Sequence, residues 1–115
     1  MYKIPVIDLF AGPGGLSHGF SSFPGPDVSF KIALSIEKDE TAYKTLHLRA
    51  FLRQFKTIPE KYYRYIRGEG DLSRKDLAAA YPEEWSKAEQ EAKQWELGKQ
   101  PFDEVYNAIT HKSVI

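Results

Sequence analysis

The sequence predicts an α/β fold built on a parallel sheet. Two short segments rich in β-branched and aromatic residues, 3–10 and 30–36, are each followed by a segment of helical character. Gly12, Gly14 and Gly15 separate the first strand from its helix. Right-handed crossovers make the strands of such a βαβα order parallel. A chain of 115 residues has the size of one domain or part of one.

The first predicted strand is KIPVIDLF, from Lys3 to Phe10, a largely apolar segment that ends at glycines. The helix after it begins near Gly15 or Leu16. It ends before FPGPD, because two prolines and a glycine predict a loop there. The second strand, FKIALSI, alternates large apolar side chains with smaller or polar ones.

The helix with the strongest pattern lies in EKDETAYKTLHLRAFLRQF, residues 37–55. Its apolar side chains recur at the spacing i, i+3, i+4, i+7, which is typical of one helix face. These residues are Leu48, Phe51, Leu52 and Phe55. Residues 1–56 are therefore predicted to form a βαβα unit that binds a ligand.

Residues 57–112 are predicted to form a helical insertion. Glu60–Ile66 is a short helix, GEGD is a turn, and Ser73 with Asp76 forms a capping box at the start of another helix. A further helix begins at Pro82, carries apolar residues as far as Trp95 and ends at Gly98. The apolar stripe of this helix is Trp85, Ala88, Ala92 and Trp95. A separate apolar stripe follows Gly98 and consists of Phe102, Val105, Tyr106 and Ile109.

The end of the sequence, SVI at 113–115, predicts the start of a strand that the chain does not complete. An open apolar strand edge predicts self-association of this chain.

The glycine turn suggests a ligand site, because main chain without Cβ atoms permits close approach. Ligands of open parallel sheets bind at the carboxyl ends of the strands, where Glu37 follows the second strand. An acid about 20 residues after such a turn is typical of ribose recognition. The alternatives are a purely structural turn and, for Glu37, an acid stabilised by a helix start. Asp8 and Asp39 are interpreted as structural acids.

Two common nucleotide fingerprints are not matched. Ser17 occupies the third glycine position of the dinucleotide motif, and no Lys-Ser or Lys-Thr pair follows the glycines as in a P-loop. The predicted ligand is therefore another adenosine-bearing compound.

The segment DLFAGPGG, Asp8–Gly15, resembles the first motif of DNA cytosine-C5 methyltransferases, and SIEKDETAYKTL, residues 35–46, resembles their second. The resemblance implies a Rossmann-like methyltransferase fold with an incomplete parallel sheet and several additional helices. It implies S-adenosyl-L-methionine as the cofactor. The implied activity is methyl transfer to C5 of a flipped-out cytosine in DNA, as in restriction-modification systems.

The resemblance also implies site residues. Phe10 would lie by the adenosine, Glu37 would hold the ribose, and the glycines would receive the methionine part. GEGDL around Asp71 resembles the third motif, whose acid meets the adenine amino group. Lys38 stands where the family often has an aromatic residue. The implied cofactor-binding residues are Phe10, Ala11, Gly12, Pro13, Gly14, Gly15, Leu16, Glu37, Lys38 and Asp71.

The family's next strand carries a Pro-Cys pair whose thiolate attacks C6 of the cytosine. This sequence contains no cysteine, so it predicts an N-terminal fragment that is inactive by itself and has no catalytic residue. His18, His47 and His111 lack metal-ligand spacing, and no metal is predicted. Two alternatives remain: a methyltransferase with the same cofactor that acts on RNA or a small molecule, and a non-catalytic binding or assembly module.

The charge and composition of the sequence limit which binding partners are expected. Residues 44–75 contain nine Lys or Arg against three acids, together with aromatic residues, which fits either phosphate contacts with base stacking or a solvated helix face over a core. The zero net charge predicts weak or no DNA binding by this chain alone, with DNA as the partner of the full-length enzyme. Trp85 and Trp95 are interpreted as packing residues. The sequence shows no membrane span and no secretory signal pattern, so a cytoplasmic protein is expected.

Overall fold

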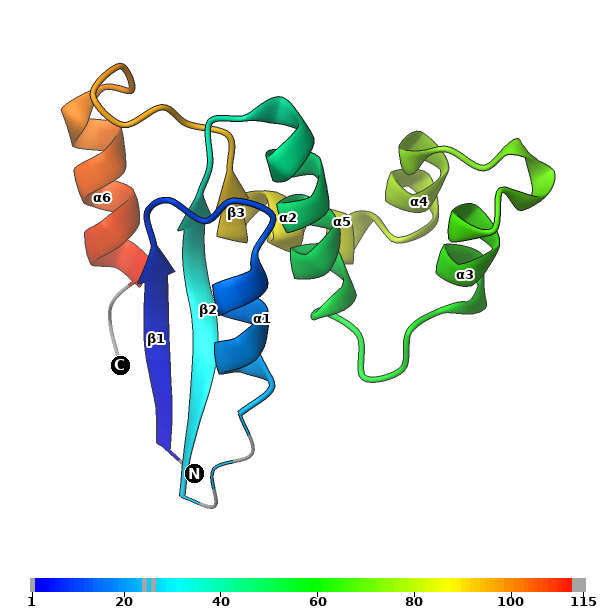
Figure 1. Ribbon diagram of the computed structural model, residues 1–115, viewed down its shortest axis with the longest axis horizontal. Coiled ribbons are helices and arrows are strands. Elements are labelled where there is room, and N and C mark those ends of the chain that lie inside the picture. Colours follow the sequence, from blue (N-terminus) through cyan, green and yellow to red (C-terminus); the bar gives the residue numbers. More distant parts are fainter. Residues whose placement is uncertain (1, 24, 26, 113–115) are drawn as a thin grey trace.

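The computed structural model describes residues 2–23, 25 and 27–112 and has an α/β fold (Figure 1). Three parallel strands lie in the order β1-β2-β3: β1 (Tyr2–Asp8), β2 (Val28–Ile36) and β3 (Ala92–Lys93). The prediction of a parallel sheet with additional helices is confirmed, and the arrangement is that of a partial Rossmann-like fold. The strand predicted at 113–115 lies outside the described residues.

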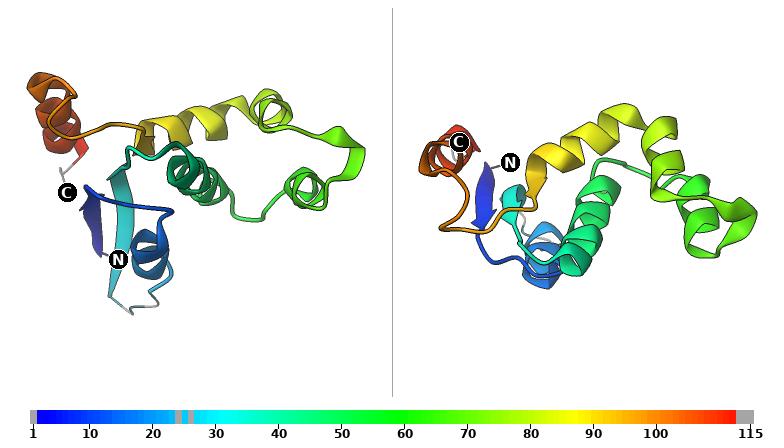
Figure 2. Two further views of the ribbon diagram at one scale, coloured as in Figure 1. Left: turned by 45° about the horizontal axis from the view of Figure 1, so that its top comes forward. Right: turned by 90° about the horizontal axis from the view of Figure 1, so that it is seen from above.

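The helix α1 (Gly15–Ser21) connects β1 to β2 and covers one face of the sheet (Figure 2). Aromatic side chains at its end pack on β2. The rings of Phe20 and Phe23 meet that of Phe30 edge to face, with ring centroids 5.0 and 5.7 Å apart. Edge-to-face pairs of this kind add about 0.5–1.5 kcal/mol to the burial of the rings. The short helix is thus held against the strand that it introduces.

The helix α2 (Glu40–Leu52) follows β2 and forms one side of the main core. Asp39 caps its N-terminus, because the Asp39 carboxylate accepts a hydrogen bond of 2.8 Å from the Ala42 N–H. Phe51 is fully buried, as the helical spacing predicted. The other three residues of that predicted stripe are half-buried against the same core: Leu48, Leu52 and Phe55.

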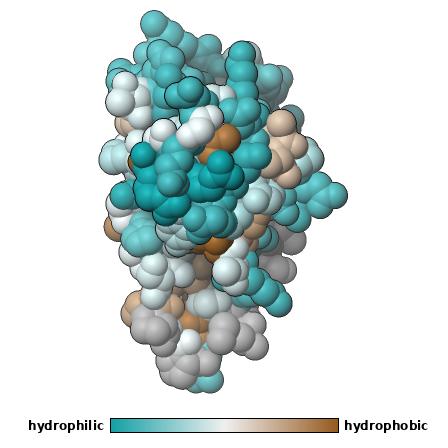
Figure 3. Space-filling model, turned by 90° about the vertical axis from the view of Figure 1, so that its right-hand side faces the viewer, coloured by the Kyte–Doolittle hydropathy of each residue, from teal (hydrophilic) through white to brown (hydrophobic). Residues whose placement is uncertain are grey.

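The segment between α2 and α5 forms a helical arm, residues 59–80, which extends away from the sheet (Figures 1 and 2). It contains α3 (Glu60–Ile66), the 3-10 turn η1 (Glu69–Asp71) and α4 (Arg74–Ala80). These elements match the predicted short helix, turn and capped helix. No residue of α3 is buried, and the surface at this end of the molecule is mainly hydrophilic (Figure 3).

The helix α5 (Pro82–Glu91) is shorter than the sequence predicted. The predicted helix runs to Trp95, but the main chain becomes extended at Ala92, where φ is −111° and ψ is 120°. Ala92 and Lys93 then pair with the last two residues of β2. The exposed edge of β2 therefore ends the helix by offering the main chain a parallel partner, and the prediction of a helix to Gly98 is wrong.

The last helix, α6 (Phe102–Lys112), lies on the opposite face of the sheet from α1 (Figure 2). Only part of its predicted apolar stripe is covered. Val105 and Ile109 are half-buried, whereas Phe102 and Tyr106 stack on each other at the surface with ring centroids 5.8 Å apart. Among the described residues, no helix has the length and apolar character needed to cross a membrane.

Candidate functional site

The carboxyl ends of β1 and β2 meet at one edge of the sheet, which we call the strand-end edge (residues 8–16 and 36–39; Figure 1). A pocket of about 250 Å³ opens there. It lies where parallel sheets bind ligands. Its lining comes from the ends of all three strands: Leu9, Phe10, Ile36, Glu37, Lys38, Trp95, Glu96 and Leu97.

The glycine turn folds back onto β2. The Ala11 N–H donates to the Ile36 carbonyl at 3.0 Å, and the Gly14 N–H donates to the Ala11 carbonyl at 3.1 Å. Gly12 and Gly14 have φ values of 56° and 94°, which side chains disfavour. A Cβ on Gly14 would also stand 3.0 Å from Leu46 Cδ1 of α2. Glycine at position 14 thus permits both the turn and its close packing on α2.

Glu37 joins the glycine turn to the start of α2. Its Oε1 accepts a hydrogen bond of 2.9 Å from the Gly12 N–H, and its Oε2 accepts one of 2.9 Å from the Asp39 N–H. Each carboxylate oxygen retains a further lone pair for a ligand hydroxyl. Glu37 lies just before the helix that Asp39 caps, and its contact with the Asp39 N–H leaves both the ligand acid and the helix-start acid open.

Two more polar contacts hold the turn. The Ser17 hydroxyl donates to Asp8 Oδ2 at 3.1 Å, which agrees with the structural interpretation of Asp8. Arg49 Nη1 of α2 donates to the Pro13 carbonyl at 3.1 Å. The turn is therefore fixed from α1, α2 and β2 at the same time.

The predicted cofactor residues divide between several places. Phe10, Glu37 and Lys38 line the pocket, and the Phe10 side chain is 81% exposed beside it. The adjoining turn comprises residues 11–14, of which Ala11 and Gly14 are buried. Residues 15 and 16 are exposed at the start of α1. A ligand role for these residues stays a prediction.

The structure places Asp71 far from this group. Asp71 lies in η1 on the helical arm, is exposed, and has a left-handed φ of 52°. It does not line the strand-end pocket. The GEGD sequence forms a turn between two arm helices rather than the end of a strand, so the assignment of Asp71 to the cofactor site is not supported by its location.

Another acid occupies the edge where Asp71 was expected. Glu96 follows β3 and lines the pocket beside Trp95 and Leu97. Its carboxylate lies 3.8 Å from Lys38 Nζ, and the Lys38 carbonyl accepts a 3.5 Å hydrogen bond from Gln94. The sequence interpretation did not assign Trp95, Glu96 and Leu97 to the site, because it extended the helix that begins at Pro82 through them. The sequence offered one signal for this site. Glu96 follows a short segment and precedes Gly98, much as Glu37 follows β2.

Within the basic segment, residues 44–75, Arg74 near the C-terminal end makes packing contacts inside the fold. Arg74 of α4 donates to His47 Nδ1 at 3.0 Å and lies 5.2 Å from the centre of the Trp85 ring. Burial, and then the Arg74 charge, lower the pKa of His47 from 6.5 to about 4. Trp85 is thus a packing residue, as predicted. Among the described residues, no group of three His, Cys, Asp or Glu is placed to hold a metal ion.

Comparison with known proteins shows which family the chain belongs to. Residues 4–96 match the family model described as C-5 cytosine-specific DNA methylase. The type II methyltransferase M.Bpa9945I of Bacillus paralicheniformis is 34% identical over 112 residues. That match covers 91% of this chain and 24% of the relative, so the chain spans about a quarter of the relative's length. No solved structure gives a significant match.

Proposed function

Because this chain belongs to the C-5 cytosine-specific DNA methylase family, we propose that it supplies the S-adenosyl-L-methionine pocket of a DNA methyltransferase. The complete enzyme would transfer a methyl group to C5 of a cytosine flipped out of its DNA substrate. One observation carries the proposal. The Glu37 carboxylate and the Gly12 main chain, which follow different strands, are joined by a 2.9 Å hydrogen bond beside an open pocket.

The pocket lining fits an adenosyl compound. The aromatic rings of Phe10 and Trp95 offer flat apolar contacts for a purine. Carboxylates accept hydrogen bonds and do not donate them, so Glu37 and Glu96 suit ribose hydroxyls and an exocyclic amino group. The cation of the lining, Lys38, lies against Glu96. Acids of this kind disfavour a phosphate-bearing cofactor and favour a sulfonium nucleoside.

The chain's own residues would bind and orient the cofactor. S-adenosyl-L-methionine supplies an electrophilic methyl group when it is bound. Glu37 would accept hydrogen bonds from the ribose hydroxyls, and Phe10 would contact the adenine. The acceptor role that motif resemblance gave to Asp71 would belong to Glu96, because Glu96 is the acid that shares a pocket with Glu37.

The Glu37 carboxylate is held before any ligand arrives. Both of its oxygens accept main-chain hydrogen bonds, so its side chain loses little conformational freedom on binding. Contacts to such an ionised acceptor are among the stronger hydrogen bonds in proteins. Glu37 is therefore the residue whose removal weakens cofactor binding most.

The chain contains no cysteine, so we propose no nucleophile within it. Methyl transfer by this chain alone is not expected. Its proposed contribution is the binding and orientation of the methyl donor, with DNA bound by the complete enzyme.

Calorimetric titration with S-adenosylhomocysteine tests the proposal. The wild-type chain should bind, and Glu37→Gln should weaken binding by about tenfold to a hundredfold, since a hydrogen bond to a charged group contributes about 1.5–3 kcal/mol. Glu40→Gln is the matched control. It removes one exposed carboxylate from the first turn of α2 and leaves the pocket lining unchanged.

Circular dichroism of each variant would separate binding from folding, because Glu37 also holds the turn. Absence of heat with the wild-type chain would contradict the proposal and favour the non-catalytic module. Equal losses for Glu37→Gln and Glu40→Gln, with folding intact, would remove Glu37 from the site.

A further inference from the structure

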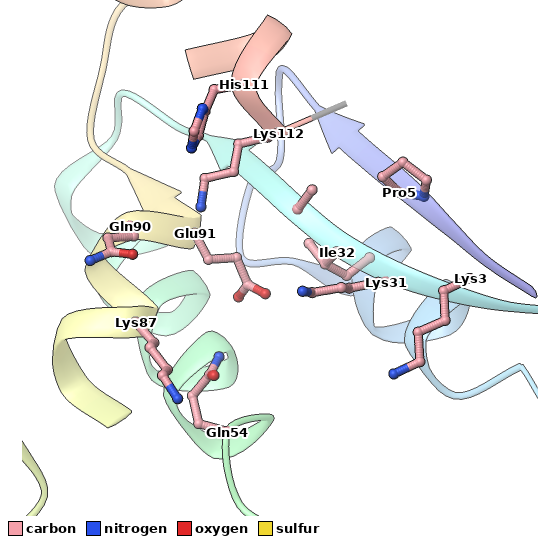
Figure 4. A pocket seen from close by; sticks show the side chains of 11 residues that line it. Lys3, Pro5, Lys31, Ile32, Gln54, Lys87, Gln90, Glu91, His111 and Lys112 are labelled. Atoms are coloured by element: carbon pink, nitrogen blue, oxygen red, sulfur yellow. The ribbon is translucent and has the colours of Figure 1, made fainter. Parts of the chain in front are cut away.

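A second cavity, which we call the rear cavity, lies on the sheet face opposite α1 (Figure 4). It has a volume of about 520 Å³ and shares no lining residue with the strand-end pocket. Strands β1 and β2 form its floor, and the segment after α2 and the C-terminal parts of α5 and α6 form its walls. Its lining is Lys3, Pro5, Lys31, Ile32, Ala33, Gln54, Lys87, Gln90, Glu91, His111 and Lys112.

Positive charge dominates this lining. The four lysines come from β1, β2, α5 and α6, so four separate elements direct cations to one cavity. In Figure 4 the amino groups of Lys31 and Lys112 point toward the carboxylate of Glu91. Both lysines act on Glu91 electrostatically and lower its pKa, although burial raises it overall. Glu91 is the one carboxylate among the lining residues.

The Glu91 carboxylate already has a closer partner. Arg53 Nη2 lies 3.0 Å from Glu91 Oε2, and the two side chains are only 19% and 12% exposed. Within the described part of the chain, none of the four lysines has an ion-pair partner within 4.0 Å. Arg53 Nε is also buried without a hydrogen-bond partner among these residues. With four lysines and one carboxylate, which is paired with Arg53, the lining thus carries a surplus of positive charge.

We infer that the rear cavity binds phosphate groups. Several ammonium groups around one space attract a multiply charged compact anion, because each added negative charge relieves repulsion among the cations. The side-chain amides of Gln54 and Gln90 add neutral donors for phosphate oxygens. An apolar ligand is disfavoured by the same lining. The phosphate could belong to a small polyphosphate or to a nucleic-acid backbone.

Titration of the complete chain with inorganic tripolyphosphate at low ionic strength tests this inference. Lys31→Gln and Lys112→Gln should each weaken binding by about tenfold, which corresponds to one charge-assisted contact. Lys75→Gln is the matched control, since Lys75 is an exposed lysine of α4 outside the cavity. It should change binding by less than about twofold.

Removing a negative charge from the cavity gives a second test, with an expected effect opposite to that of the lysine variants. Glu91→Gln removes the cavity's carboxylate and keeps an acceptor for Arg53, so it should tighten tripolyphosphate binding. Because Glu91 is partly buried, circular dichroism must show that this variant folds; the lysine variants test the inference even if it does not. Absence of binding by the wild-type chain would overturn the inference, and so would equal losses in all three lysine variants.

A competition experiment identifies the source of the phosphate. If a short DNA duplex displaces tripolyphosphate from the wild-type chain, and Lys31→Gln impairs both, the cavity takes nucleic-acid phosphates. If the duplex does not compete, it takes small polyphosphates. The inference does not depend on the proposed cofactor pocket, because S-adenosylhomocysteine binding should be unchanged in the lysine variants.

Discussion

The strand-end edge and the helical arm differ in the sequence range of the polar contacts that stabilise each of them. At the strand-end edge, the hydrogen bond between Gly12 and Glu37 joins residues 25 apart, and that between Arg49 and Pro13 joins residues 36 apart. Such contacts form only when the whole fold is in place. They can therefore hold groups from different elements in one fixed arrangement, as a ligand site requires.

In the helical arm most polar contacts are local. Arg67 bonds to Glu60 and Glu69, seven and two residues away, and Ser73 bonds to Asp76, three residues away. These contacts stabilise helices and turns but do not fix the arm to the sheet. The attachment of the arm depends on α4, through buried Leu77 and through the long-range contacts of Arg74. The difference shows why a ligand site is expected at the edge rather than on the arm.

The pH dependence of stability tests the long-range anchor of the arm and has the largest expected effect. The pKa of His47 is about 4 in the folded chain and near 6.5 when unfolded, so the neutral form is the one that folding favours. Its contribution is complete above about pH 6.5 and is lost as the pH falls toward 4. Because a tenfold change in proton affinity corresponds to about 1.4 kcal/mol, the loss is about 3 kcal/mol.

Urea unfolding of the wild-type chain and His47→Gln at pH 7 and pH 4.5 would measure this loss. Partial burial raises the pKa of Glu91, so this residue changes stability in the opposite direction with pH, and it is common to both proteins. The difference between them therefore isolates His47. If both lost stability in parallel, the anchor at His47 and Arg74 would not control the acid sensitivity.

Alanine substitutions at glycines compare the two regions directly, with an intermediate effect. Gly14→Ala should reduce the free energy of unfolding by about 2 kcal/mol or more, because it combines a left-handed φ with a Cβ only 3.0 Å from Leu46. Gly68→Ala, in the arm, should reduce it by about 1 kcal/mol, since its φ is 72° but nothing lies within 4 Å.

Gly15→Ala serves as the control for both glycine variants. Gly15 begins α1 without a positive φ, and no atom lies within 4 Å of the point where an alanine Cβ would stand, so the substitution should cause little change. Urea unfolding at pH 7 would rank the three variants. Equal losses for Gly14→Ala and Gly68→Ala would mean that the turn is not packed more tightly than the arm.

Removal of a local ion pair should have the smallest effect. Arg67→Gln breaks contacts to Glu60 and Glu69 on the exposed side of the arm, where water and salt weaken ion pairs. The melting temperature should not change measurably in scanning calorimetry. A clear decrease, absent in about 1 M salt, would show that the local contacts of the arm support the whole fold.

The elements that the sequence predicted well carry local signals. Helix α1 ends at Ser21, shortly before two prolines in the sequence, and the start of α4 has a capping box. The strand β3 has no such signal. It is two residues long, and Ala92 fits the apolar stripe of α5 as well as it fits a strand. The segment is extended where it pairs with Ser35 and Ile36 at the open edge of β2.

The candidate site also contains residues that the sequence could predict and residues that it could not. Glu37 and the glycine turn could be predicted, because each follows a strand with a strong local pattern. Which further acid lines the pocket could not be predicted, since Asp71 and Glu96 both follow the second strand and both lie near glycines. The path of the chain through the helical arm brings Glu96, and not Asp71, to the pocket. That path depends on contacts between distant residues.

The unequal lengths of β2 and β3 have a consequence for hydration. β2 has nine residues, but β3 pairs only with Ser35 and Ile36. The main-chain groups of residues 28–34 that point away from β1 pair with no neighbouring strand within the described residues, so they need other partners such as water. This side of the sheet borders the rear cavity. A molecule that displaces water from that cavity binds well only if its own polar atoms replace the hydrogen bonds that the water made.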